Sequence, residues 1–204
     1  AFQIFMLFIS INNRSVLRLR DIEGLNSEMT QMVQELVPMN AEELELLSVN
    51  QLDVNGLKGL ESVKTGKFTS VYYEPLVAYA HKQYSYPADS SVLLVSTTTD
   101  NFVYESEGYR TTVYLNEEEL GVIDADGSMY EAKTDRLLAH IEVDGDLSAH
   151  PVKVGEREVG EIVNLRLNAS PNPRAYQLLE PMNLREKQLF KALTFLSLVE
   201  ESVL

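Results

Sequence analysis

The sequence predicts a mainly β fold of the α+β kind, in which an antiparallel β-barrel encloses a hydrophobic C-terminal helix, with a small N-terminal helical segment. Three observations lead to this fold class. Short runs rich in Val, Tyr, Thr and Leu follow one another from Gly66 onward, separated by turn residues roughly every 8–12 residues. The stretch Leu189–Val199 is apolar on nearly every side. One strand–turn–strand unit occurs twice, at 112–123 and 151–162.

Residues 1–50 are expected to form an N-terminal segment close to a membrane anchor. The apolar run Phe2–Ile11 is about half of the ~20 residues that a spanning helix needs. It is either the end of such an anchor or a buried element of the domain. Arg14, Arg18 and Arg20 follow it, and basic residues next to a span favour the cytoplasmic side. We therefore expect the protein in the cytoplasm or on the cytoplasmic face of a membrane.

The segment 26–37 is expected to be a helix, capped by Asn26 or Ser27 and ended by Pro38. A second, short helix is expected from Asn40 to about Leu47. Four apolar residues of the first helix share one face because of their spacing. We interpret this stripe as core contact rather than a groove for a partner: Met29, Met32, Val33 and Leu36.

Residues 51–204 are expected to form the barrel domain. The strands alternate with hairpin signals such as Asp126-Gly127 and Asp144-Gly145, which favours an antiparallel sheet over a βαβ pattern. The predicted strands are 68–74, 76–84, 92–99, 102–107, 110–115, 120–124, 128–132, 137–143, 151–154, 159–167 and 174–180.

The two copies of the repeated unit carry a glycine at the same place in the second strand, Gly121 and Gly160. Both copies place acidic residues in the turn, at 117–119 and 156–158. Glycine inside a strand indicates a bulge or a close approach of backbone. A sheet built by repeating one hairpin follows from this pattern.

The closing helix is expected at 184–201, with Asn183 and Glu186 as a capping box. A helix that is apolar all round lies in protein or in lipid, and its apolar part is too short to span a bilayer. A helix of roughly 18 residues is about 27 Å long, close to the ~25 Å of a strand of seven or eight residues. We therefore predict strands that close around the helix. The alternative is an open sheet with the helix across one face. In the barrel, no large internal ligand pocket is expected.

A barrel of eleven or twelve strands around a C-terminal hydrophobic helix resembles the tubby C-terminal-like superfamily, which includes tubby domains, phospholipid scramblases and the plant LURP-one-related proteins. The segment KALTFLSLVEE (191–201) is similar in pattern to the scramblase terminal helix, and the L-G-x-I and V-G-x-I hairpins resemble those of the family. The likeness covers roughly residues 66–204.

The chain also departs from that family. It has no cysteine for acylation and no proline-rich leader. Where the resemblance implies a calcium site before the terminal helix, residues 170–183 hold one acid, Glu180. Where it implies a basic site for phosphoinositides, the chain has a net charge of −14. Family function is therefore not carried over residue by residue.

Composition excludes several function classes. The net charge of −14 repels nucleic-acid phosphates, so no nucleic-acid partner is expected. The absence of cysteine excludes disulfides, thiol catalysis and thiolate metal sites. Neither a phosphate-binding glycine loop nor a G-x-S-x-G motif appears, and no cofactor is expected.

Two groups of residues remain as candidate sites. Asp124, Asp126 and Glu131 resemble part of a calcium loop, although a plain Asp-Gly hairpin turn explains them as well. His140 or His150, with nearby acids, would serve a surface-site hydrolase. We favour a third hypothesis, a non-catalytic interaction or scaffold protein that associates with a membrane and has a lipid or protein partner. The oligomeric state stays open.

Overall fold

The structure, a computed structural model, describes residues 16–38, 43–57, 62–85, 89–143, 145–168 and 170–203. Within these ranges it contains two α-helices, one short 3-10 helix and one twelve-stranded sheet. The helices are α1 (Val16–Gln34), η1 (Glu43–Leu46) and α2 (Leu184–Val203). The strands are β1 (Leu47–Leu57), β2 (Ser62–Ser70), β3 (Pro75–Tyr84), β4 (Ser90–Ser96), β5 (Asn101–Glu107), β6 (Arg110–Leu115), β7 (Glu118–Asp124), β8 (Ser128–Tyr130), β9 (Leu137–Ile141), β10 (Ala149–Val154), β11 (Arg157–Val163) and β12 (Tyr176–Leu178).

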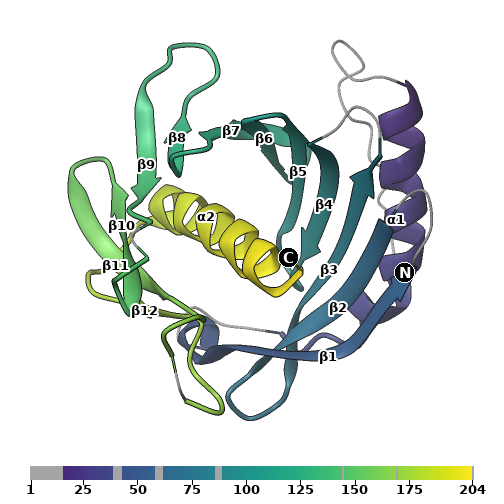
Figure 1. Cartoon of the computed structure of the whole chain (residues 1–204), viewed down its shortest axis with the longest axis horizontal. Coiled ribbons are helices and arrows are strands. Elements are labelled where there is room, and N and C mark those ends of the chain that lie inside the picture. The colour runs from purple at the N-terminus through teal and green to yellow at the C-terminus, as the bar shows by residue number, and fades with distance from the viewer. Residues whose placement is uncertain are drawn as a thin grey trace.

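Every strand pairs antiparallel with the next strand along the chain, so the sheet is a continuous meander from β1 to β12. The first and last parts of the sheet meet at an antiparallel bridge between Ser48 and Arg174. Beside it, the Ala175 amide donates to the Leu47 carbonyl at 2.7 Å. The sheet is thus a nearly closed barrel, as Figure 1 shows, and the predicted fold class is confirmed.

The helix α2 lies inside this ring of strands (Figure 1). Its capping box forms as predicted, with the Glu186 amide donating to Asn183 Oδ1 at 3.0 Å and the Asn183 amide to Glu186 Oε2 at 2.8 Å. Strand side chains hold the helix from several directions: Tyr104 donates to the Ala192 carbonyl, and Phe102 packs edge-on against Phe195. Nine residues of its apolar stretch are buried: Leu189, Phe190, Ala192, Leu193, Thr194, Phe195, Leu196, Leu198 and Val199.

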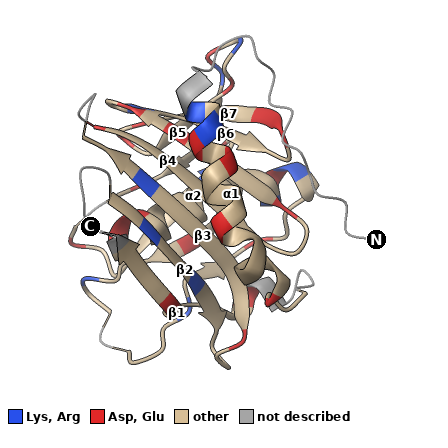
Figure 2. Cartoon of the chain, turned by 90° about the vertical axis from the view of Figure 1, so that its right-hand side faces the viewer, with Lys and Arg blue, Asp and Glu red and all other residues tan. Residues whose placement is uncertain are grey.

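The helix α1 packs on the outside of the barrel, where it covers β3 and β4 (Figure 2). These strands are consequently buried on both faces, which explains why they read as continuous apolar runs in the sequence. Val77 and Tyr79 point inward, whereas Ala78 and Ala80 lie under α1. Met29 of the predicted stripe is 1% exposed and belongs to this outer cluster, so the core interpretation of the stripe is confirmed.

The start of α1 was predicted too late. The helix begins at Val16, not at a cap near Asn26, because Ile22 and Leu25 extend the apolar face toward the N-terminus and pack on the sheet. An ion pair and a hydrogen bond hold α1 against β3. Asp21 pairs with Lys82 at 2.8 Å and accepts a hydrogen bond from the Tyr84 hydroxyl at 2.7 Å. In Figure 2, the α1 ribbon carries acidic positions in red, and the strand ribbons beside it carry basic positions in blue.

The short second helix expected from Asn40 to about Leu47 is present as the 3-10 helix Glu43–Leu46, but the strands begin before Gly66, where the sequence placed their start. The structure has one 3-10 turn, then β1 and an earlier start of β2; residues 39–42 lie outside the described ranges. Two register shifts interrupt the pairing of β1 with β2, and Asp53 has a positive φ of 52°. These irregularities remove the period-two pattern that identifies a strand.

Gly121 and Gly160 occupy matching places in the two repeated hairpins, as the sequence predicted. The register shifts beside them, between Val113 and Tyr114 in β6 and between Val152 and Lys153 in β10. A Cβ at Gly121 would lie 2.6 Å from the carbonyl oxygen of the next strand, and a Cβ at Gly160 would lie 2.7 Å from the corresponding one. Both glycines therefore mark a bulge and a close backbone approach.

Candidate functional site

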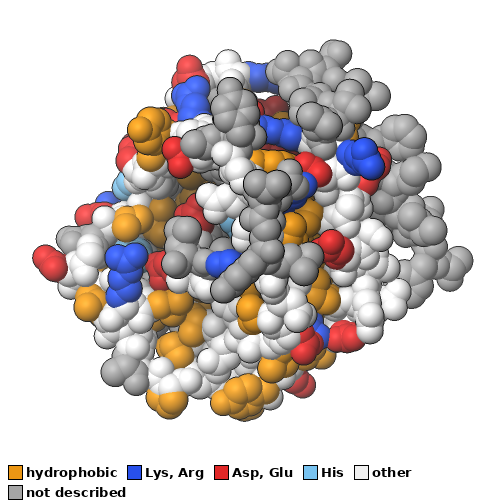
Figure 3. Space-filling model, turned by 45° about the vertical axis from the view of Figure 1, so that its right-hand side comes forward, with side chains coloured by type: hydrophobic (Ala, Val, Ile, Leu, Met, Phe, Trp, Pro, Cys, Tyr) orange, Lys and Arg blue, Asp and Glu red, His pale blue; other side chains and the backbone are white. Residues whose placement is uncertain are grey.

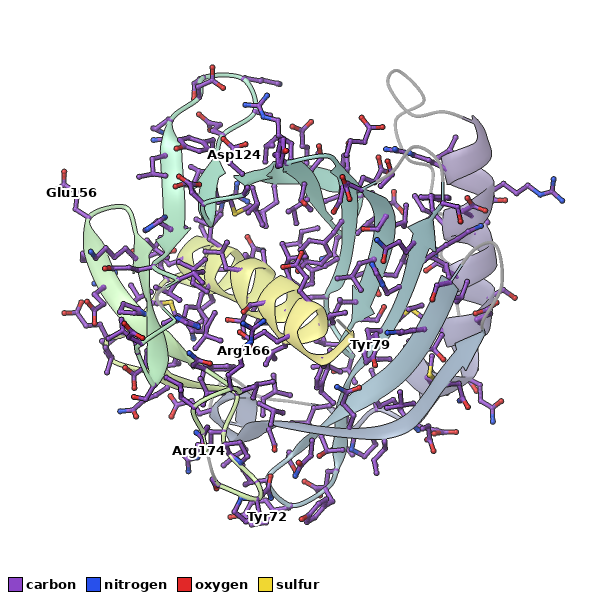
Figure 4. All side chains as sticks on the ribbon, viewed as in Figure 1. Tyr72, Tyr79, Asp124, Glu156, Arg166 and Arg174 are labelled. Atoms are coloured by element: carbon purple, nitrogen blue, oxygen red, sulfur yellow. The ribbon has the colours of Figure 1, made fainter. Side chains whose placement is uncertain are left out.

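An open-mouthed pocket of about 660 Å³ lies at the end of the barrel where α2 finishes. It is lined by residues at or near the ends of nine strands, β3 to β11, and by the last three turns of α2. In Figure 4, Asp124 and Arg166, which both line it, lie on opposite sides of α2. Its volume falls within the range of small-molecule sites. The helix α2 fills the middle of the barrel but not its mouth, so this pocket lies at the opening of the barrel (Figure 1).

The floor of the pocket is apolar. Ile123 and Ile141 come from the strands, and Leu193 and Leu196 come from α2. All four are buried, and they belong to the main core cluster. The rigid barrel core thus extends directly into the floor, so a hydrophobic part of a ligand would meet a preformed surface.

His150 stands in the wall of the pocket. It is 4% exposed, and it lies two residues before the core residue Val152 on β10, so both point to the barrel interior. No group among the described residues bonds to its buried Nδ1 atom. Buried polar atoms are normally paired, and an unpaired one costs about 1–3 kcal/mol. A ligand that reaches this atom from the pocket would complete its hydrogen bond.

Acidic side chains surround the opening. Glu200 and Glu201 come from the last turn of α2, and Asp89 and Asp124 come from strand ends, whereas Arg166 is the single Lys or Arg in the lining. Glu200 is exposed to solvent, but the protein around its carboxyl group excludes part of the water. This desolvation and the neighbouring Glu201 raise the pKa of Glu200.

The two terminal glutamates also oppose the helix dipole. The C-terminal end of a helix carries partial negative charge, which favours basic residues there. The last turn of α2 holds none, while Glu200 and Glu201 occupy it. Proteins often keep an arrangement that weakens a helix where the residues concerned serve a function. This conflict was visible in the sequence and is the signal that sequence reasoning missed.

The predicted calcium residues lie along one hairpin and its continuation. Asp124 forms an ion pair with Arg110 at 3.1 Å. Asp126 accepts a hydrogen bond from the Ser128 amide at 2.9 Å, which lowers its pKa. Glu131 accepts from Thr134, which lowers its pKa, and pairs with Arg136 (3.4 Å). In the described part of the chain no group of three His, Asp or Glu side chains is arranged to hold a metal ion. A calcium site at these residues stays a prediction.

The histidines of the hydrolase hypothesis lie apart. His140 Nδ1 is 3.1 Å from the Ser128 hydroxyl, while Asp126 bonds to the amide of the same serine. In a nucleophilic triad the acid orients the histidine instead. His150 lies in the mouth pocket, and Asp146 is exposed on the loop before it, whereas Asp144 lies outside the described residues. The structure therefore brings neither histidine into a triad with an acid.

The comparison with known protein families found no family model that matches this chain. No curated protein and no solved structure matches it either. Among the described helices, none is long and apolar enough to cross a membrane.

Proposed function

We propose that this chain is a non-catalytic interaction module that associates with a membrane through the mouth of its barrel. The observation that carries the proposal is a set of large apolar side chains exposed on the mouth loops. Tyr109, in the turn between β5 and β6, is 85% exposed, and Val143, after β9, is 69% exposed. Both line the mouth pocket, and Leu147 lies on the same β9–β10 loop.

Exposed apolar side chains on neighbouring loops support this kind of contact, because each loses water-exposed area when it enters the lipid interface. Tyrosine suits the interface in particular, since its ring is apolar and its hydroxyl is polar. On the face in Figure 3, hydrophobic side chains lie among charged ones of both signs. The net charge of −14 argues for neutral rather than anionic lipid.

The kinship with the tubby-like superfamily belongs to the same proposal. A twelve-stranded meander around a C-terminal helix supports it at the level of architecture. That family includes membrane-associated proteins, which agrees with a membrane role for this chain.

Vesicle pelleting tests the membrane proposal. Neutral phosphatidylcholine vesicles should bind the protein, and vesicles that also contain phosphatidylserine should bind it more weakly, with the difference shrinking as salt is added. A variant carrying Tyr109→Ser, Val143→Ser and Leu147→Ser should lose at least about tenfold in partitioning, because the transfer free energy of three side chains is removed.

A matched control changes one tyrosine and two aliphatic residues exposed at the other end of the barrel: Tyr72→Ser, Leu179→Ser and Leu184→Ser. It should partition like the unchanged protein. Absence of binding to every vesicle composition would overturn the proposal, as would an equal loss in both triple variants.

A further inference from the structure

We propose that the mouth pocket binds a primary alkylammonium ligand, with its ammonium group between His150 and Glu200 and its hydrocarbon chain on the apolar floor. This assignment does not depend on membrane association, because the pocket is part of the folded barrel whether or not the rim meets lipid. Three independent features of the pocket support it: the unpaired His150 Nδ1 atom, the acidic opening and the buried floor.

The unpaired His150 Nδ1 atom favours a ligand that can donate a hydrogen bond. A neutral imidazole whose other nitrogen carries the proton presents Nδ1 as an acceptor. An N–H of a ligand would pair with it and remove the cost of the unsatisfied atom. In the other tautomer Nδ1 would carry the proton and pair with an acceptor instead. The acidic side chains of the same pocket disfavour an anionic acceptor there, so the two features together favour a ligand that donates.

The negative charge of the acidic side chains around the opening favours a cationic ligand. Glu200 accepts no hydrogen bond from any described residue, and the desolvation that raises its pKa would be offset by a bound ammonium group. The free carbonyls at the end of α2 add negative potential at the same place. Arg166 lines the pocket too, but among the described residues it makes no ion pair with Glu200 or Glu201. Glu201 accepts a hydrogen bond from the Leu165 amide at 3.4 Å, so Glu200 is the acid at the end of α2 that is available to a ligand.

The apolar floor of the pocket favours a ligand with a hydrocarbon chain. Ile123, Ile141, Leu193 and Leu196 offer buried apolar surface below the acidic opening. A primary ammonium fits better than a quaternary one, because a quaternary group has no N–H for His150. It also draws much of its binding energy from aromatic cages, whereas Tyr109 is the single aromatic residue in the lining.

Titration calorimetry with decylammonium, below its micelle concentration, tests the assignment. We expect one-to-one binding to the whole chain. Decanoate has the same tail and the opposite charge, and ethylammonium has the same charge and almost no tail. Each should bind at least about tenfold more weakly, because each lacks one of the two interactions.

The variants separate the pocket from unspecific detergent binding. Glu200→Gln removes an exposed charge without disturbing the core, and it should weaken decylammonium binding at least about tenfold. Glu118→Gln, an exposed acid at the other end of the barrel, should leave the affinity unchanged. In the unchanged protein, the 15N shift of His150 Nδ1 should move when the ligand is added. Equal binding of decanoate, unchanged affinity in Glu200→Gln, or an unmoved His150 signal would each overturn the assignment.

Discussion

At the scale of single residues, His81 is a histidine whose protonation is strongly shaped by the fold. It lies on β3 with the same inward orientation as Tyr79, directly opposite Lys64 of β2. Burial, and secondarily the charge of Lys64, lowers the pKa of His81 from its usual value of 6.5 to about 4. The folded protein therefore keeps this imidazole neutral well into the acid range.

This shift predicts that acid weakens the fold through His81. Between pH 6.5 and about 4, the unfolded chain binds a proton at this residue while the folded chain does not. The free energy of unfolding therefore falls as the pH falls through this window, by up to about 2 kcal/mol between pH 7 and pH 5. Urea unfolding at a series of pH values measures it.

The variant His81→Gln isolates this contribution, because glutamine keeps a polar side chain and does not titrate. Its stability should decline less between pH 7 and pH 5 than that of the unchanged protein. His140→Gln, which removes a histidine bonded to Ser128, serves as the control and should keep the full decline. Parallel pH curves for the unchanged protein and His81→Gln would contradict the assignment.

At the scale of elements, the hairpin of β10 and β11 depends on a glycine that holds it close to both β12 and α2. A Cβ at Gly160 would lie 2.7 Å from the Gln177 carbonyl oxygen and 2.9 Å from a carbon of the Phe190 ring. The first neighbour is backbone and cannot rotate away. The position therefore joins the sheet to the helix inside it.

Gly160→Ala should lower the free energy of unfolding by about 1–3 kcal/mol, because the methyl group overpacks a closed site. Gly24→Ala is a matched change in α1, where nothing lies within 4 Å of the added atom. It should raise stability by up to about 1 kcal/mol through helix propensity. Chemical denaturation measures both. An unchanged free energy of unfolding in Gly160→Ala would mean that β12 or Phe190 shifts easily to make room for the methyl group.

At the scale of the whole molecule, two hydrophobic clusters share the same strands. The inner cluster surrounds α2 and the outer cluster lies under α1, while β3 and β4 contribute to both, through Val77 and Leu93 inside and Ala78 and Leu94 outside. Loss of either helix would expose one face of these two strands. We therefore expect the described part of the chain to unfold as one cooperative unit.

Two core truncations test this cooperativity. Phe195→Ala, in the inner cluster, should cost about 3–5 kcal/mol, and Met29→Ala, in the outer cluster, about 2–5 kcal/mol. Both should shift a single transition that tyrosine fluorescence and circular dichroism report together. A separate early transition in Met29→Ala would show that α1 is an independent segment, as the division at residue 50 predicts.

Much of the fold follows from local pattern. The strands from β3 to β12, the capped and apolar α2 and the two glycines of the repeat were all predicted from the sequence. Periodicity, turn chemistry and the lack of a side chain in glycine are properties of neighbouring residues. The candidate site was not, since its members come from distant segments. Asp124 was identified in the sequence as part of a calcium loop or a hairpin turn, and His150 was identified for catalysis rather than for a pocket wall.

The sequence by itself determined that strands had to surround the segment 189–199, because an all-apolar helix has no face to show to water. Only the tertiary structure decided where the barrel closes and where it stays open. Closure depends on Ser48 meeting Arg174, and the pocket depends on Glu200 and His150 reaching the same space. Such contacts join residues far apart in the chain. They depend on strand tilt and register, which a short stretch of sequence does not determine.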